Sequence, residues 1–111
     1  MLNIQTLKGN QVHLWQIKLD QLTEQDSAGC SMLTQGELEK VNRLQHVKHR
    51  QRALSMRRQL RVLLSAYLKT SASDIEFTYD PFGKPQLKNT PLFFNISHSQ
   101  NTALVAISHH E

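Results

Sequence analysis

The sequence predicts an α+β domain in which a small, mostly antiparallel sheet packs against one long helix and one short helix. Two apolar runs separated by a short polar segment near the carboxyl end indicate a β-hairpin. Apolar residues recur at helical spacing between residues 38 and 67, and an alternating segment precedes them at residues 12–19. The resulting order is strand, helices, strand, strand, strand, which favours helices laid on an antiparallel sheet.

The first strand is predicted at residues 12–19, where His13, Trp15, Ile17 and Leu19 share one face. Small and polar residues at 22–30 predict a connection. Thr34 and Glu37 then have the spacing of a capping box, in which each side chain accepts a hydrogen bond from the other residue's backbone amide. We therefore expect a helix to begin there.

The helical segment is predicted to be interrupted once. Apolar residues recur at helical spacing from Leu38 to Val47, and again from Ala53 to Tyr67, but residues 48–52 are all polar. We expect a short helix, a polar break near residues 47–50, and a long helix that ends at about Lys69.

The carboxyl-terminal part is predicted to be β-structure. Ile75, Phe77 and Tyr79 alternate with polar residues, which indicates a strand with one buried face. Residues 80–83 and 88–91 contain proline or glycine signals for turns. The hairpin strands are expected at residues 92–96 and 102–108, with residues 97–101 as the polar turn between them.

Length and composition limit the class of protein. The chain has 111 residues, which suits one domain over residues 1–111. It contains no apolar run long enough to span a membrane and no secretory signal pattern at its start. Cys30 is the only cysteine, so an internal disulfide is impossible and a cytoplasmic location is expected.

The positive charge is concentrated in one segment. The chain has a formal net charge of +4, and no acidic residue lies between Glu39 and Asp74. This distribution suits phosphates or an acidic partner. The basic residues between positions 40 and 61 are Lys40, Arg43, Lys48, Arg50, Arg52, Arg57, Arg58 and Arg61.

Arg52 falls on the apolar stripe of the predicted long helix, together with Met56 and Leu60. A buried guanidinium needs an anionic partner, and no carboxylate is near in sequence, so a bound phosphate is one interpretation. The other is that the side chain extends from the helix end into solvent.

The other arginines of this helix fall on a different stripe, which predicts a solvated face or, alternatively, a surface for an acidic protein or a nucleic acid. Nucleic acid is the weaker alternative because no base-stacking motif is present. The residues are Arg50, Arg57, Arg58 and Arg61.

The predicted hairpin tip carries Ser97, His98 and Ser99, which can all donate to an anion, and Lys84 follows Gly83 in a turn. Such a tip can equally be a solvated turn. Metal binding is poorly supported, since His46 and His49, His98, and the pair His109 and His110 lack accompanying carboxylates or thiols.

The sequence around two of these motifs resembles the surfactin-synthetase-activating type of 4′-phosphopantetheinyl transferase. The shared motifs are Gly83-Lys84-Pro85 and Phe94-Asn95-Ile96-Ser97-His98-Ser99, in the family's order and spacing. The resemblance implies transfer of phosphopantetheine from coenzyme A to a serine of an acyl or peptidyl carrier protein. It implies that Pro85 shapes the adenine side, and that a further set of residues holds the phosphates. This set is Lys40, Arg52, Lys84, Ser97 and His98.

The chain also departs from the family pattern. Members of this type consist of two similar halves, and their magnesium-binding aspartate and glutamate motifs are not found in residues 1–111. Ala53 stands where some members have a hydroxyl residue. The sequence is therefore expected to be an N-terminal half that binds coenzyme A weakly or not at all by itself and does not catalyse transfer.

Its expected partners are a carrier protein and either the missing half or a second copy. Magnesium is expected only in the complete enzyme. A non-catalytic basic module that docks an acidic carrier protein or nucleic acid is the alternative.

Overall fold

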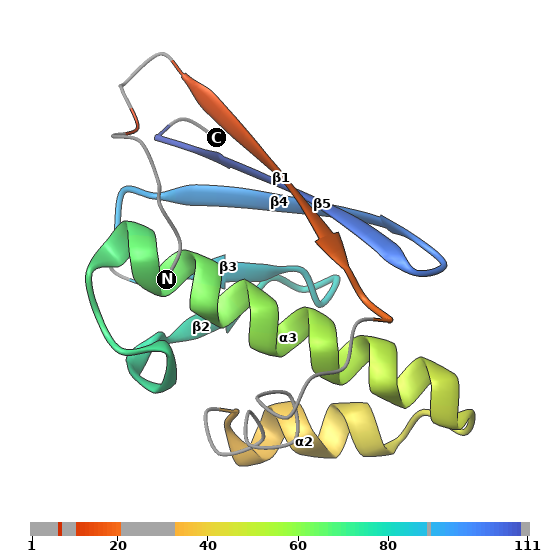
Figure 1. Cartoon of the computed structure of the whole chain (residues 1–111). Coiled ribbons are helices and arrows are strands. Elements are labelled where there is room, and N and C mark those ends of the chain that lie inside the picture. Colours follow the sequence, from red (N-terminus) through yellow and green to blue (C-terminus); the bar gives the residue numbers. More distant parts are fainter. Residues whose placement is uncertain (1–6, 8–10, 21–32, 89, 110–111) are drawn as a thin grey trace.

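The computed structural model of the chain describes residues 7, 11–20, 33–88 and 90–109. Figure 1 shows a long helix running along one face of a three-stranded sheet, with a short helix on the far side of the long one. The helices are α2 (Gln35–Asn42), α3 (Val47–Leu68) and the short 3₁₀ helix η2 (Ala72–Asp74). The strands are β1 (Val12–Lys18), β2 (Phe77–Tyr79), β3 (Pro85–Leu87), β4 (Phe93–Ser99) and β5 (Thr102–Ser108). The predicted α+β class is confirmed.

The three-stranded sheet has the order β1-β5-β4 and is antiparallel throughout. Trp15 of β1 and Ile96 of β4 both lie opposite Val105 of β5, which fixes the register. Alternate residues of each strand point toward α3, and most of these residues are apolar, so this face of the sheet is apolar. Its central residues pack against Leu60 and Leu64 of α3 in one core cluster.

The opposite face of the sheet is exposed. Side chains that alternate with the core residues point to it, and several are large and apolar. They are Val12 (61% exposed), Leu14 (72%), Phe93 (40%) and Leu104 (48%). Figure 1 shows this face on the side of the sheet away from α3.

The capping box at the start of α2 is confirmed. The Glu37 amide donates to Thr34 Oγ1 at 3.2 Å, and the Thr34 amide donates to Glu37 Oε1 at 3.0 Å. The break between the helices lies at residues 43–46, so its prediction near residues 47–50 was wrong. Lys48, His49 and Arg50 belong to the first turn of α3, where polar residues are accommodated because the side chains are largely exposed.

Two β-features also differ from prediction. The segment Ser97–Ser99 was expected in a turn, but it continues β4 and pairs with Leu104, Ala103 and Thr102 of β5. Only Gln100 and Asn101 separate the two strands, and Gln100 has a positive φ of 47°. The short strand β3, which pairs with β2, was not predicted.

The predicted connection at residues 22–30 and Cys30 lie outside the described residues. Among the helices that are described, none has the length and apolar character needed to cross a bilayer.

Candidate functional site

A cavity of about 780 Å³ lies between the first half of α3 and the strands. This volume is within the usual range for small-molecule sites, roughly 300–1,000 Å³. Contributions come from α2, α3, the β2–β3 hairpin and the end of β4. The lining residues are Leu19, Glu37, Leu44, His49, Arg52, Ala53, Met56, Arg57, Leu60, Phe77, Tyr79, Gly83, Pro85, Ile96, His98 and Gln100.

The α3 wall follows directly from helical spacing. Ala53, Met56 and Leu60 recur every three or four residues and so share one face, which supplies an apolar surface. Arg52 and His49 stand nearer the start of the helix, and they place basic groups at one end of this surface. The cavity is therefore apolar toward the core and basic toward the start of α3.

The β4 wall is set by the alternation of the strand. Ile96 and His98 both line the cavity, since residues two apart in a strand share a face. Ser97 lies between them and points to the other face of the sheet, where it is exposed. The extension of β4 through Ser99 thus separates two side chains that the sequence placed together in one turn.

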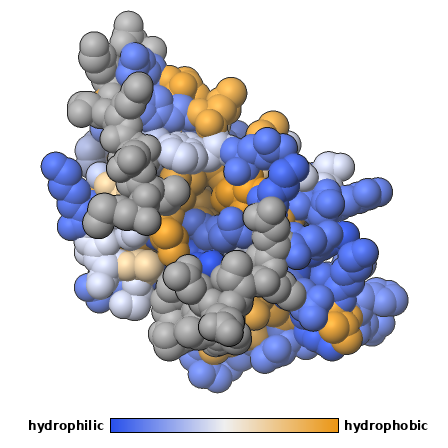
Figure 2. Space-filling view, viewed as in Figure 1, coloured by the Kyte–Doolittle hydropathy of each residue, from blue (hydrophilic) through white to orange (hydrophobic). Residues whose placement is uncertain are grey.

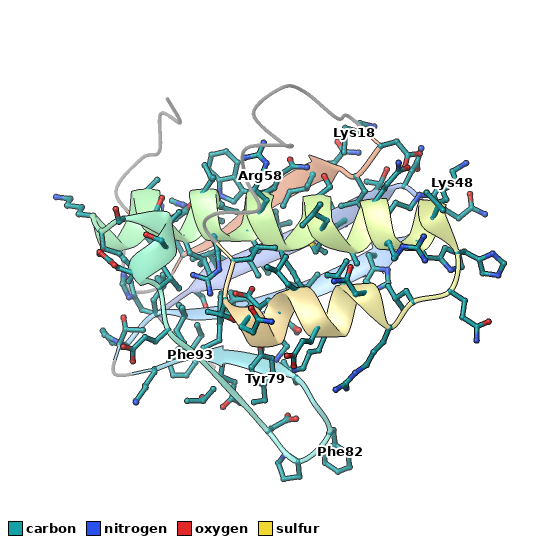
Figure 3. All side chains as sticks on the ribbon, turned by 90° about the horizontal axis from the view of Figure 1, so that it is seen from below. Lys18, Lys48, Arg58, Tyr79, Phe82 and Phe93 are labelled. Atoms are coloured by element: carbon teal, nitrogen blue, oxygen red, sulfur yellow. The ribbon has the colours of Figure 1, made fainter. Side chains whose placement is uncertain are left out.

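The β2–β3 hairpin supplies the third wall through a fixed turn. Asp80 Oδ1 accepts hydrogen bonds from the amides of Phe82 (2.9 Å) and Lys84 (2.8 Å), and Gly83 has a φ of 86° that favours glycine. Beyond the turn, Pro85 lines the cavity. Figure 3 shows Phe82 at the tip of this hairpin and Tyr79 between the hairpin and α2.

Tyr79 connects the hairpin to α2. The ammonium of Lys40 lies 3.7 Å from the centroid of the Tyr79 ring, a cation–π contact. Tyr79 lines the cavity, and Lys40, which contacts its ring, is not among the lining residues.

Arg52 has a carboxylate partner that the sequence did not reveal. Its Nε donates to Asp20 Oδ1 at 2.8 Å and its Nη2 to Asp20 Oδ2 at 3.2 Å. Asp20 follows β1 and is separated from Arg52 by 32 positions. The hydrogen bond from Arg52 is the main cause that lowers the pKa of Asp20 below its ordinary value. The anionic partner of Arg52 in the chain is therefore a carboxylate distant in sequence, which neither interpretation of the sequence included.

Arg61 is buried, whereas a solvated face was predicted for it. Its side chain is 1% exposed and lies beside Glu37, which is 4% exposed. Arg61 Nε donates to Glu37 Oε1 at 3.0 Å, and Nη1 donates to the carbonyls of Ala72 (2.8 Å) and Ile75 (2.9 Å). Because all of these partners are distant in sequence, the helical stripe alone suggested exposure.

Burial alone would raise the pKa of Glu37. The hydrogen bond from Arg61, the Thr34 amide and the charges of Arg61 and Arg57 outweigh it, so the pKa is lowered overall. Glu37 thus stays ionised at the wall of the cavity and holds α2 against α3.

The structure brings together three of the six residues predicted to contact coenzyme A. Arg52, Pro85 and His98 line the same cavity. Lys84 instead lines a second, smaller cavity with residues of β3, β4 and β5, so the expected convergence holds for Arg52 and His98 but not for Lys84. Lys40 and Ser97 do not line the large cavity either.

Two further basic residues line the cavity and were not selected from the sequence. His49 was considered only as a metal ligand, and Arg57 was assigned to the solvated face. Both lie within one or two helical turns of Arg52 on α3. This spacing was the sequence signal from which their place in the cavity wall could have been predicted. Figure 2 shows hydrophilic side chains gathered on the side of the molecule where α3 begins.

This arrangement suits an anion with an apolar part better than a metal ion. Guanidinium and imidazole groups are donors for phosphate oxygens, and the apolar wall can bury a less polar group. Within the described ranges, no three His, Cys, Asp or Glu side chains gather to hold a metal. Glu37 is the cavity's carboxylate and is engaged by Arg61, so the described residues do not fit a magnesium site.

Comparison with known proteins identifies the family. Residues 15–110 match the family model described as 4′-phosphopantetheinyl transferase, N-terminal. The chain therefore belongs to the 4′-phosphopantetheinyl transferase family and contains its N-terminal domain.

Two curated relatives support this membership. The 4′-phosphopantetheinyl transferase HetI of Nostoc sp. is 39% identical over 108 residues, which are 94% of this chain and 46% of HetI. The protein slr0495 of Synechocystis sp., assigned to the same kind of transferase, is 37% identical over 82 residues, or 70% of this chain and 33% of that protein. The chain therefore matches about half the length of HetI and about a third of the length of the Synechocystis protein.

Proposed function

We propose that the cavity binds the phosphates of coenzyme A and forms the substrate-binding half of a surfactin-synthetase-activating type of phosphopantetheinyl transferase. The complete enzyme would transfer phosphopantetheine to a serine of an acyl or peptidyl carrier protein. The observation that carries this proposal is that Arg52 and His98 line one cavity from two different elements, with Pro85 beside them. Family membership supports the same conclusion.

Arg52 suits one phosphate because its planar fork can donate two parallel hydrogen bonds. His98 would donate from the β4 wall, and His49 and Arg57 add donors along α3. Lys40, Lys84 and Ser97 do not line the cavity, and their contacts with the ligand remain predictions. Magnesium is proposed to bind only in the complete enzyme.

The proposal is tested by titrating the ¹⁵N-labelled chain with coenzyme A and following Arg52 Nε–H and the His98 ring by NMR. This method measures dissociation constants in the millimolar range, which suits the weak binding by the N-terminal half that is proposed here. Arg52→Ala and His98→Ala should each weaken binding at least about tenfold, because each removes a charge-assisted hydrogen bond.

Lys88→Ala is the matched control, since it removes one positive charge from an exposed side chain that pairs with Glu76 rather than lining the cavity. Binding by this variant should be unchanged. Equal weakening by all three variants would indicate a general charge effect, and no response to coenzyme A in the wild type would contradict the proposal.

A basic module that docks an acidic carrier protein remains the second candidate, supported by the exposed basic residues at the start of α3, among them Lys48. Capture of acidic carrier proteins that coenzyme A does not affect would favour it. Binding to arbitrary DNA with a steep salt dependence would favour the nucleic-acid form of the same alternative.

We also propose that the exposed apolar face of the sheet, formed by Val12, Leu14, Phe93 and Leu104, meets the C-terminal half found in longer relatives. Pairing of two copies through this face is the alternative. If copies pair through this face, light scattering should show self-association that Leu14→Glu abolishes, whereas a monomer at all concentrations would exclude pairing of copies.

A further inference from the structure

We propose that Asp20 sets the affinity of the cavity for its ligand, because its carboxylate occupies the Arg52 guanidinium and is exchanged for a phosphate when the ligand binds. This inference rests on the proposed function, since it takes coenzyme A as the ligand. It adds a residue that lies outside the cavity lining and that no motif singled out.

The geometry of the pair is that of a bound anion. Two nitrogens of Arg52, Nε and Nη2, face the two carboxylate oxygens of Asp20 at 2.8 and 3.2 Å. Carboxylate and phosphate present two oxygens to a guanidinium in the same bidentate manner. The Asp20 carboxylate therefore takes the donors that a phosphate would use.

Asp20 is held in this place by elements other than α3. The Leu19 amide donates to the Asn101 carbonyl at 2.7 Å, which fastens the end of β1 to the β4–β5 turn. The nearby Asn101 side chain and the positive charge of Lys48 also help to lower the pKa of Asp20, so both favour its ionised carboxylate. These contacts keep the carboxylate at the edge of the cavity, and they would remain available to it after Arg52 moves to a phosphate.

The pair is accessible enough to exchange. The Asp20 side chain is 42% exposed, and that of Arg52 is 18% exposed. Ion pairs open to solvent contribute little free energy, because water and ions compete for both partners. By contrast, Glu37 and Arg61 are almost completely buried, and breaking that pair would leave a buried charge without its partner.

Two functions of Asp20 make opposite predictions. If Asp20 competes with the phosphate, then Asp20→Asn removes the competitor and should tighten coenzyme A binding about twofold to fivefold, the range expected for one exposed ion pair. If Asp20 instead orients Arg52 and stays paired in the complex, the same substitution should weaken binding. The sign of the change separates the two.

The experiment compares coenzyme A and pantetheine, which lacks the phosphates, by NMR titration of the full chain and its variants. Asp20→Asn should tighten binding of coenzyme A and leave that of pantetheine unchanged. Asp74→Asn is the control, since it removes the same charge from an exposed residue of η2, beyond the opposite end of α3. It should leave both affinities unchanged.

A second measurement uses only the wild-type chain, so it does not depend on whether a variant folds. The pKa of Asp20, followed by the carboxyl ¹³C shift, is lowered in the free chain by its hydrogen bond with Arg52. It should rise toward its ordinary value when coenzyme A saturates the cavity.

Unchanged or weaker binding by Asp20→Asn, or a pKa of Asp20 that does not rise, would overturn the inference. If Arg52→Ala still abolishes binding in that case, the proposed function stands without it. If the wild type does not respond to coenzyme A, both are overturned.

Discussion

Substitution of Arg61 by methionine should destabilise the chain far more than any other arginine substitution on α3. The change removes the donors of the buried Glu37 carboxylate and of the Ala72 and Ile75 carbonyls. Breaking a buried ion pair by deleting one partner costs about 3–5 kcal/mol. The whole free energy of unfolding of a domain is about 5–15 kcal/mol, so the loss is at least about a fifth of the stability.

The assay is urea unfolding followed by circular dichroism. With a urea m value of about 2 kcal/mol/M, the midpoint should fall by about 2 M. Arg50→Met is the matched control, because Arg50 Nη1 also donates to two carbonyls, those of Leu44 and Gln45, but at an exposed position. The control should lose about 1 kcal/mol or less.

The double variant Glu37→Gln/Arg61→Met supplies the internal test. Glu37→Gln removes the buried carboxylate charge that Arg61→Met leaves unpaired, so the double variant should have a free energy of unfolding at least about 1 kcal/mol higher than Arg61→Met alone. If Arg61→Met is no more destabilising than Arg50→Met, or if the double variant is the sum of its parts, the argument for a coupled buried pair is refuted.

Three further predictions concern the elements that frame the cavity. Acid should destabilise the chain as the pH falls below about 4.5, because the pKa of Glu37 is lower in the folded state than in the unfolded state. The ionised Glu37 carboxylate therefore contributes its full stability only above its unfolded pKa. In Arg61→Met, burial dominates and raises this pKa, so the ionised carboxylate should destabilise the fold instead. Thr34→Ala removes the cap of α2 and should cost about 1 kcal/mol in urea unfolding. Gly83→Ala should cost about 1–2 kcal/mol, because its φ of 86° strains any side chain even though no atom lies within 4 Å of an added Cβ; no loss in the melting temperature would refute this.

Local patterns carried much of the fold prediction. The alternation at residues 12–19 gave β1, and Thr34 with Glu37 gave the start of α2, since both signals depend on neighbours within a few residues. The polar stretch Lys48–Gln51 misplaced the helix break, because a first turn that faces solvent needs no apolar residue. The turn at Ser97–Ser99 was also misplaced, since polar residues near a strand end resemble a turn.

The site was harder to predict because it depends on pairs distant in sequence. Helical spacing placed Arg52 on the apolar stripe of α3 and left open whether its side chain was buried or extended into solvent. Its pairing with Asp20 depends on where β1 ends in space. Arg61 was assigned to the solvated stripe of α3, because its burial depends on partners outside the helix, among them the Ala72 and Ile75 carbonyls. Its partner Glu37, 24 positions away, had already been explained by the cap.

The measurement that tests the central claim most directly is a map of the backbone and side-chain NMR shifts caused by coenzyme A. The account predicts that the largest changes cluster at Arg52, His98 and Pro85 and leave the exposed sheet face at Leu14 and Leu104 unchanged. Changes centred on that sheet face, or changes at Lys84 without any at Arg52 and His98, would contradict it.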